Sequence, residues 1–235
     1  MPRHDGATRP PIPRHRDAAA TQIRLLDAAE REFAQRGYAG ARLKDIASVA
    51  GVQTTLIHHY FGDKRGLYRA VMDRALAPQQ TESWNILRVH RDLEGLVRGF
   101  VAMLIRFYAK HKHLLAIMRH EAVTGSEVLP EILRERMTPL ADAVMAMIAD
   151  MQSRGELRTD VRPLDVVVLT LSMAVHPFVD GLLLEAVLPG SVPSDDEALA
   201  RREDTIATLL LRALSVPPAA VAGPSPGAAS APQIP

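Results

Sequence analysis

The sequence predicts an all-α protein, built from a small N-terminal three-helix unit and a larger helical domain. Apolar residues recur at three- and four-residue spacing along most of the 235 residues, which is the period of a buried helix face. No convincing hairpin is present, and the one β-prone run, VVVL from Val166, lies in a long stretch without turn signals. With 47% apolar and 23% charged residues, the chain can bury a core, which excludes wholesale disorder.

Both ends of the chain differ in composition from the middle. Residues 1–16 are rich in proline and arginine, and residues 216–235 in proline, alanine and glycine, so we expect a disordered arm and a disordered tail. The arm lacks the apolar stretch of a signal peptide. The longest apolar region, Val166 to Val175, is too short to span a membrane. We therefore expect a cytoplasmic protein with no membrane contact.

Charge is distributed unevenly along the chain, although the net charge is only +1. Residues 1–76 contain 13 Lys and Arg against 8 Asp and Glu, whereas the remainder contains 15 against 19. A basic first part joined to an acidic remainder indicates that only the first part meets a polyanion. The chain has no cysteine, which excludes disulfides, thiolate metal sites and a cysteine nucleophile.

The first predicted helix begins near residue 21 and closes at Gly37, which suits the position after a last helical turn. Two short helices are predicted at 43–50 and 54–60. A longer helix starts after Asp63, a good N-cap, and we expect a bend at Pro78. The apolar stripe of the first helix consists of Ile23, Leu26, Ala29 and Phe33.

The larger domain is predicted from five further periodic stretches. Pro139 predicts a kink in the third of them, and Pro163 suits the first position of a long apolar helix. Ser194 and Glu197 have the spacing of a capping box and open the last helix. The five stretches cover residues 93–108, 114–122, 129–151, 163–187 and 194–214.

The segment LKDIASVAGVQTTLIHHYF has the order helix, glycine, helix, which is the helix-turn-helix layout. Ala47 is small where two short helices cross, and Gly51 accepts the positive φ of the turn at little cost. Ile46, Val52 and Ile57 supply an apolar underside. The exposed side of the second helix then has polar or methyl-bearing groups and no acid, which suits base edges and phosphates. These groups belong to Gln53, Thr54, Thr55, Leu56, His58 and His59.

EFAQRGYAGARLKDIASVAGV leads into this motif, and HHYFGDKRGLYRAVMDRAL leads out of it. Over residues 20–76 the arrangement strongly resembles the TetR family of bacterial transcriptional regulators, and the helical remainder has that family's length. The resemblance implies a helix-turn-helix DNA-binding domain at 17–64 and an effector-binding and dimerisation domain at 65–215. It also implies a repressor that releases a palindromic DNA operator when a small molecule binds the C-terminal domain.

The DNA-contacting positions of the family map onto this sequence one by one. The resemblance assigns base reading to residues 53–56, and contact with backbone or a thymine methyl to His58. It assigns phosphate contacts to His59, Tyr60 and Lys64, and backbone contacts to the start of the second helix. The implied DNA-binding set is Arg42, Lys44, Gln53, Thr54, Thr55, Leu56, His58, His59, Tyr60 and Lys64.

Three places depart from the family pattern. Arg42 and Leu43 stand where the family commonly has Thr or Ser, so Arg42 would replace a hydroxyl cap through its charge. Gln53 stands where the family commonly has Ser. Leu56 replaces a frequent Thr, which leaves a methyl contact in place of a hydrogen bond.

The resemblance places an effector pocket inside the larger domain. Methionines at helical spacing are ordinary core filling, or they line a cavity for a bulky and largely apolar ligand. Pro177 removes a backbone hydrogen bond next to His176, and such a kink often borders a cavity. The pocket candidates are Met103, Phe107, Met118, Arg119, His120, Met145 and His176.

The last two long helices are apolar on more than one face, so each must be buried on more than one side. One side meets the chain's own core, and we expect the other to meet a second copy in a four-helix interface. A homodimer presents two recognition helices, as an inverted repeat of double-stranded DNA requires.

Two other classes of protein stay open. An all-helical metal enzyme would need His/Glu ligands, but the adjacent His58 and His59 point about 100° apart on a helix. His113, His120 and Glu121 lack the usual i, i+4 ligand spacing, so we expect no metal, no cofactor and no enzyme. The other alternative is a DNA-binding adaptor whose C-terminal domain binds a protein.

Overall fold

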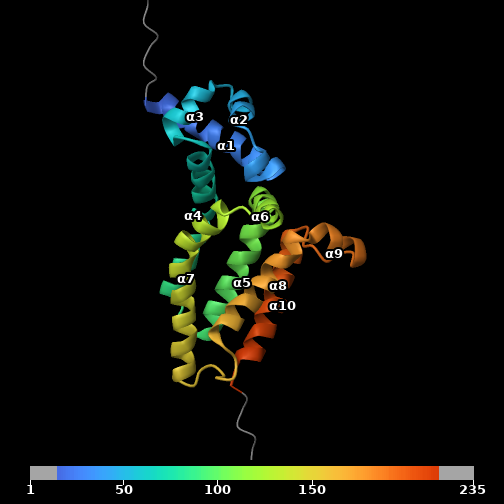
Figure 1. The fold of residues 1–235 in the computed structure, drawn as a ribbon. Helices are drawn as coiled ribbons and strands as arrows, with labels where there is room; N and C mark the ends of the chain where they lie inside the picture. The colour runs from blue at the N-terminus through green and yellow to red at the C-terminus, as the bar shows by residue number, and fades with distance from the viewer. Residues whose placement is uncertain (1–14, 217–235) are drawn as a thin grey trace, which may run out of the picture.

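The computed structural model describes residues 15–216, and each regular element in that range is an α-helix, as expected (Figure 1). The expected arm and tail lie outside the described residues, except for Val216 and for the start of α1 at His15, inside the expected arm. The helices are α1 (His15–Gly40), α2 (Leu43–Ala50), α3 (Thr54–Phe61), α4 (Lys64–Val89), α5 (Leu93–Lys110), α6 (Lys112–Thr124), α7 (Val128–Ser153), α8 (Pro163–Val179), α9 (Gly181–Val187) and α10 (Asp196–Leu214).

Helices α1, α2 and α3 form one end of the molecule together with the first turns of α4 (Figure 1). Their core contains an aromatic pair: the rings of Phe33 and Tyr68 are fully buried and nearly perpendicular, with centroids 4.9 Å apart. Gly37, with φ 65° and ψ 177°, interrupts α1. The expected end of a helical run at this glycine is therefore confirmed, although helical turns resume as far as Gly40.

Helix α4 joins this end to the rest of the molecule. The carboxylate of Asp63 accepts a hydrogen bond from the Gly66 N–H at 2.8 Å, which confirms the expected N-cap. Arg74 fastens α4 to α1 through Asp27 at 2.7 Å and Glu30 at 2.6 Å. The helix is continuous from Lys64 to Val89, with Pro78 inside it, so it reaches from the N-terminal end into the body of the larger domain.

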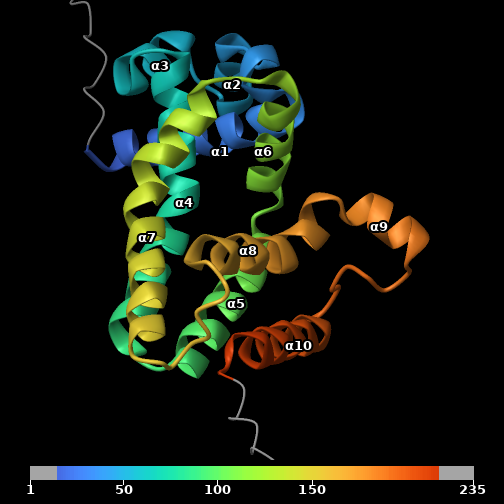
Figure 2. The same cartoon turned by 60° about the horizontal axis from the view of Figure 1, so that its bottom comes forward.

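The larger domain is a bundle with α5 at its centre. Helix α5 packs against α4, α8 and α10, while α7 packs against α4 and α8. Helix α6 turns back towards the N-terminal end and lies against α1 (Figure 2). The three-helix end is therefore joined to the larger domain in two ways: α4 begins within it, and α6 packs against it.

The expected single helix over residues 163–187 is wrong, because the structure has two helices, α8 and α9, bent by 80°. Pro177 lacks the N–H that would continue the helical hydrogen bonds, and three residues later Asp180 leaves helical geometry at φ −108° and ψ 23°. Among the described residues no single helix combines the length and hydropathy of a membrane span. Helices α8 and α9 reach that level only together, across their bend.

The start of the last helix also differs from the expectation. Asp195, not Ser194, caps α10, and its carboxylate accepts a hydrogen bond from the Ala198 N–H at 2.8 Å. A carboxylate is a stronger acceptor than a hydroxyl for the partly positive N–H groups of a first turn. Helix α10 therefore starts one position later than capping-box spacing suggests.

Candidate nucleic-acid interface and effector cavity

The segment from α2 to α3 has helix-turn-helix geometry. Gly51 occupies the left-handed region at φ 67° and ψ 38°, and the Val52 N–H donates to the Ala47 carbonyl at 3.0 Å. Ala47 is buried, and Ile46 and Ile57 are fully buried beneath the two helices. The expected roles of these residues are confirmed in position: a small residue at the crossing, a glycine in the turn and an apolar underside.

Helix α3 turns a surface without acidic residues to solvent. Of the expected base-reading residues, Gln53 and Thr55 are exposed, whereas Thr54 and Leu56 are half-buried. Leu56 packs partly against the core, so only part of its side chain is free for a methyl contact. This face presents amide, hydroxyl and methyl groups, which are the groups that read base edges in a major groove.

The C-terminal half of α3 carries its aromatic and histidine residues. His58 and His59 are exposed, and a ring nitrogen of His58 lies 2.8 Å from the Gly62 carbonyl oxygen. Tyr60 is half-buried, with its ring 5.0 Å from that of His59. The expected backbone-contacting residues are thus gathered at one end of α3, next to the start of α4.

The N-termini of α2 and α3 lack side-chain caps. Arg42 and Gln53 occupy the N-cap positions with extended backbones, and neither side chain accepts a hydrogen bond from its helix. Arg42 and Lys44 are exposed. The first-turn N–H groups of α2 and α3 are therefore available to phosphate oxygens. At α2, the cations of Arg42 and Lys44 lie beside these groups.

Lys64 lies at the junction of α1 and α4 and is half-buried. Its ammonium donates to the Ala39 carbonyl at 3.1 Å and stands 4.9 Å from the centre of the Tyr38 ring. Burial lowers the pKa of Lys64, and the negative charge of Glu121 partly offsets that shift. An ammonium has three N–H groups, so donors remain for a phosphate after the bond to Ala39.

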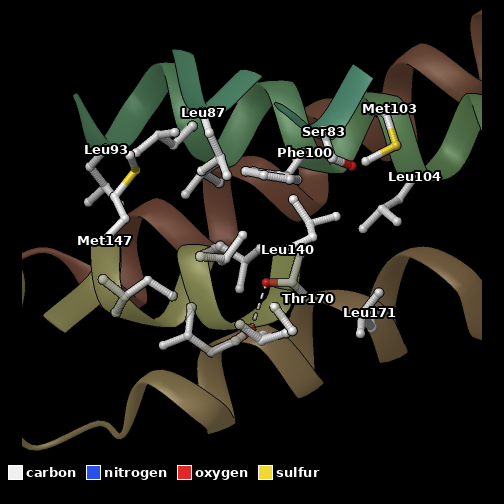
Figure 3. A pocket seen from close by; sticks show the side chains of 18 of the residues that line it. Ser83, Leu87, Leu93, Phe100, Met103, Leu104, Leu140, Met147, Thr170 and Leu171 are labelled. Carbon is white, nitrogen blue, oxygen red and sulfur yellow. Dashed lines mark hydrogen bonds between the residues drawn. The ribbon is translucent and has the colours of Figure 1, made fainter. Parts of the chain in front are cut away.

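A second site lies inside the larger domain, where a cavity of about 210 Å³ opens between α4, α5, α7, α8 and α10 (Figure 3). Apolar side chains form most of its wall, with Phe100, Leu140 and Met147 prominent in the close view. The lining residues are Gln79, Ser83, Leu87, Leu93, Leu96, Val97, Phe100, Met103, Leu104, Met137, Leu140, Ala141, Val144, Met147, Ile148, Met151, Leu157, Val166, Val167, Thr170, Leu171, Leu210 and Leu214.

Among the described residues, no charged side chain lines this cavity. Its polar lining residues are Gln79, Ser83 and Thr170. The hydroxyl of Ser83 donates to the Gln79 carbonyl at 2.8 Å. The hydroxyl of Thr170 donates to the Val166 carbonyl, also at 2.8 Å (Figure 3). A wall of this kind suits a neutral and largely apolar molecule, because burying an unpaired charge there is costly.

Of the seven expected pocket residues, only Met103 lies on the wall of this cavity. Phe107 is buried and stacks on His111 at 4.0 Å between ring centres. Met118 packs against the core, and Met145 is half-buried outside the lining. Phe107 and Met145 belong to helices that form the cavity wall, and Met118 belongs to the adjacent α6. The side chains of all three lie on helix faces that do not line the cavity.

The three polar candidates lie elsewhere. Arg119 borders a separate hollow of about 440 Å³ between α5, α6, α8 and α9. His120 packs against the break in α1, where a Cβ added to Gly37 would lie 3.2 Å from its own Cβ. His176 pairs with Asp180 at 3.4 Å on an exposed surface.

The sequence did contain the signal for one cavity wall. Along α7, lining residues recur at helical spacing, so they form one stripe, and Met145 falls beside it. Helix periodicity alone could not show that this stripe faces a cavity and not solid core. The stripe consists of Met137, Leu140, Ala141, Val144, Met147, Ile148 and Met151.

The candidate metal ligand His113 and the nearby His111 make separate contacts. His113 lies 3.5 Å from Glu30 of α1, while His111 has a ring nitrogen 2.6 Å from the Phe107 carbonyl oxygen. Within residues 15–216, no group of three or more His, Asp or Glu side chains converges in a way that could hold a metal ion.

The fold and these two sites define a class of protein: an all-helical helix-turn-helix DNA-binding protein with a cavity in its C-terminal domain. Residues 25–71 match the family described as bacterial regulatory proteins of the tetR family, and residues 94–209 match its tetracyclin repressor-like C-terminal domain. The chain belongs to the TetR family and is a DNA-binding transcriptional regulator.

Individual relatives agree with this assignment. The HTH-type transcriptional repressor SCO4008 of Streptomyces coelicolor is 31% identical over 160 residues, which cover 68% of this chain and 79% of the relative. The HTH-type transcriptional regulator TtgR of Pseudomonas putida is 27% identical over 188 residues, covering 75% and 85%. The structure of the fatty acid degradation regulator FadR from Bacillus halodurans has a TM-score of 0.64 at 16% identity, covering 81% and 94%.

Proposed function

We propose that this regulator is a homodimeric repressor that binds an inverted repeat and leaves it when a neutral, largely apolar molecule occupies the cavity. Residues 17–64 read DNA, and residues 65–215 dimerise and bind the effector. The protein acts in the cytoplasm, where its DNA lies, and without a catalytic step, because its family is one of transcriptional regulators. The uncharged cavity is the observation that carries the choice of effector class.

The exposed apolar residues of the last helices support a dimer. Leu164, Val168 and Leu169 of α8 and Leu209 of α10 are each at least half exposed in the single chain. Large apolar side chains gathered on adjacent helices mark a surface that another protein covers. A second copy burying the same two helices places two α3 helices on one DNA duplex.

Helix α4 links the two sites without an intervening loop. It begins at Lys64, next to the DNA-facing groups, and its later residues Gln79, Ser83 and Leu87 line the cavity. A ligand that fits the cavity better when α4 is displaced would shift the protein towards a state with misplaced recognition helices. The ligand must prefer that state, because equal affinity for both states shifts nothing.

The cavity also weighs against the adaptor alternative. A C-terminal domain that only docks a protein needs an apolar surface but not a concave space walled by several helices. The lining residues come from five helices around a volume of about 210 Å³, which favours a small molecule over a protein partner.

The test is selection of bound duplexes from a random DNA pool, followed by affinity measurement on the recovered sequence. We expect an inverted repeat, and we expect the Thr55→Ala/His58→Ala/Tyr60→Ala variant to lose it. Release is tested with Ala141→Phe, which fills the cavity from α7. This variant should keep DNA affinity but no longer respond to neutral apolar compounds that release the wild-type protein.

A control keeps the two parts of the proposal separate. Val123→Ala changes an exposed residue of α6 outside the cavity lining, so both DNA affinity and release should match wild type. Folded dimeric protein that enriches no sequence would contradict the DNA-reading part. Release that survives in Ala141→Phe would contradict the cavity as effector site.

A further inference from the structure

Glu121, near the end of α6, is a carboxylate buried between the larger domain and the DNA-binding end. Glu121 is only 4% exposed to solvent, and acidic residues are rarely this buried unless their oxygens are hydrogen-bonded. Oε1 accepts a hydrogen bond from the backbone N–H of Tyr38 at 2.8 Å. Oε2 has no hydrogen-bond partner within the described part of the chain. Packing alone does not explain a charge at this position.

The N–H that Glu121 binds lies at the break in α1. Gly37 has non-helical dihedrals, so the carboxylate supplies an acceptor where the helical ladder is interrupted. Helix α6 fits closely against this break: a Cβ on Gly37 would lie 3.2 Å from the Cβ of His120 and 3.6 Å from Oε1 of Glu121. The residue after Gly37 is therefore held from the α6 side.

Lys64 holds the same short segment from the α4 side. Its ammonium donates to the carbonyl of Ala39 at 3.1 Å and stands 4.9 Å from the centre of the Tyr38 ring. Burial lowers the pKa of Lys64, whereas the nearby charge of Glu121 raises it, so the two groups also interact electrostatically. Tyr38 and Ala39 thus connect a buried anion on α6 with the cation expected to meet phosphate.

We propose that Glu121 is a positioning residue for DNA binding, which fixes the Tyr38–Ala39 segment and thereby holds Lys64 where it meets a phosphate. This inference rests on the proposed function, since it requires Lys64 to contact DNA. Without an acceptor at residue 121, the Tyr38 N–H loses its partner and the segment loses its contact with α6. The anchor of Lys64 then moves, and the lysine contributes less to phosphate binding.

The experiment is a double-mutant cycle with Glu121→Met and Lys64→Met. Affinity for the duplex recovered by DNA selection is measured by fluorescence anisotropy at several salt concentrations. We expect each single variant to weaken binding roughly fivefold and to flatten the salt dependence by about 0.9, the slope of one phosphate contact. The double variant should bind like Lys64→Met alone, because Glu121 acts through Lys64.

Two further variants separate positioning from simple loss of structure or charge. Glu121→Gln keeps an acceptor for the Tyr38 N–H and should bind within about twofold of wild type. Glu131→Met removes a different carboxylate that pairs with α4 through Arg65 and Arg69, and it should not weaken binding. If Glu121→Met does not fold, Glu121→Asp replaces it, since its carboxylate is one methylene too short for the same bond.

The outcomes distinguish the inference from its premises. Independent losses that multiply in the double variant would mean that Glu121 acts on the fold and not through Lys64. Wild-type affinity in folded Glu121→Met, or in Glu121→Asp when that variant replaces it, would also overturn the inference. An unchanged salt slope in Lys64→Met would instead remove the phosphate role of the lysine, and failure to enrich any duplex would remove the proposed function itself.

Discussion

Gly37 and Gly51 both have a positive φ, yet their surroundings constrain them differently. Gly51 lies in the left-handed helical region, and a Cβ there would meet nothing within 4 Å. Gly37 combines φ 65° with ψ 177°, a region that is nearly restricted to glycine, and its added Cβ would lie 3.2 Å from His120. Gly51 is therefore required only by the backbone conformation of a turn. Gly37 is required both by its backbone conformation and by the close contact with α6.

Replacing each glycine by alanine should separate these two demands. We expect Gly51→Ala to lower the free energy of unfolding by about 1 kcal/mol, from backbone strain alone. Gly37→Ala should cost more, on the order of 3 kcal/mol, because strain adds to displacement of α6. Urea unfolding of both variants measures the difference. Equal losses would mean that the approach of His120 contributes nothing.

At the scale of the element, α4, α5 and α10 each begin with an aspartate N-cap. Asp63, Asp92 and Asp195 each accept a hydrogen bond from the backbone N–H three residues later, at 2.8 Å in every case. These bonds satisfy donors that a first turn leaves unpaired, and the carboxylates face the positive end of the helix. The starts of α4, α5 and α10 are therefore chemically specified.

Two of these caps give the stability of the protein a dependence on acid. The pKa of Asp92 is lowered by the hydrogen bond from the Gly95 N–H, and that of Asp195 by the bond from Ala198. A lowered folded-state pKa gives stability that is present above the unfolded value of about 3.9 and is lost as pH falls below it. Asparagine also caps helices but does not titrate.

The Asp92→Asn/Asp195→Asn variant should therefore lose less stability than wild type between about pH 4 and pH 2. Urea midpoints of both proteins across that range and at pH 7 give the comparison. Parallel curves would show that the two caps do not contribute to acid unfolding.

The elements could be predicted where their determinants are local. The αL glycine at residue 51, the Asp63 cap and the apolar underside of α2 and α3 each depend on neighbours within a few residues, and the structure has them as predicted. A kink at Pro177 could be predicted, but the division into two helices could not, because Pro177 lies inside α8 and the chain leaves the helix only at Asp180. The residue at which the helix ends depends on packing at both sides of the proline.

At the scale of the whole molecule, the cavity depends on how five helices meet. No stretch of sequence specifies a void, and for this reason six of the seven expected pocket residues lie away from its lining. A Met-containing cavity wall was one of two interpretations of the methionines, and Met103, Met137, Met147 and Met151 line the cavity. What could not be derived was which helix faces converge.

The uncharged wall predicts which compounds stabilise the protein. Decan-1-ol should raise the melting temperature with concentration, because a ligand that binds only the folded state stabilises it. Decanoate at pH 8 should raise it far less, because its charge would be buried without a partner. Thermal unfolding with each compound, and with Ala141→Phe as a filled-cavity control, provides the measurement. Equal shifts from both compounds would contradict binding in this cavity.

The dimer surface makes a separate prediction for the assembled molecule. Leu169→Glu places a charge among the exposed apolar residues of α8 and should shift the protein to monomer, with a large loss of operator affinity. Val123→Glu introduces the same charge at an exposed position of α6 and should leave the dimer intact. Sedimentation velocity determines the mass of each. A dimeric Leu169→Glu variant would place the interface elsewhere.

The uninterrupted α4 has a consequence for building chimeric regulators. One continuous helix carries both Lys64 and the residues that face the cavity, so the rotation of the DNA-binding end relative to the cavity depends on the number of residues between them. Each residue inserted or deleted there turns one module by about 100° and moves it about 1.5 Å along the axis. When the effector-binding domain is fused to a different DNA-binding domain, the junction within α4 must therefore keep the number of residues that gives the same rotation about the helix axis.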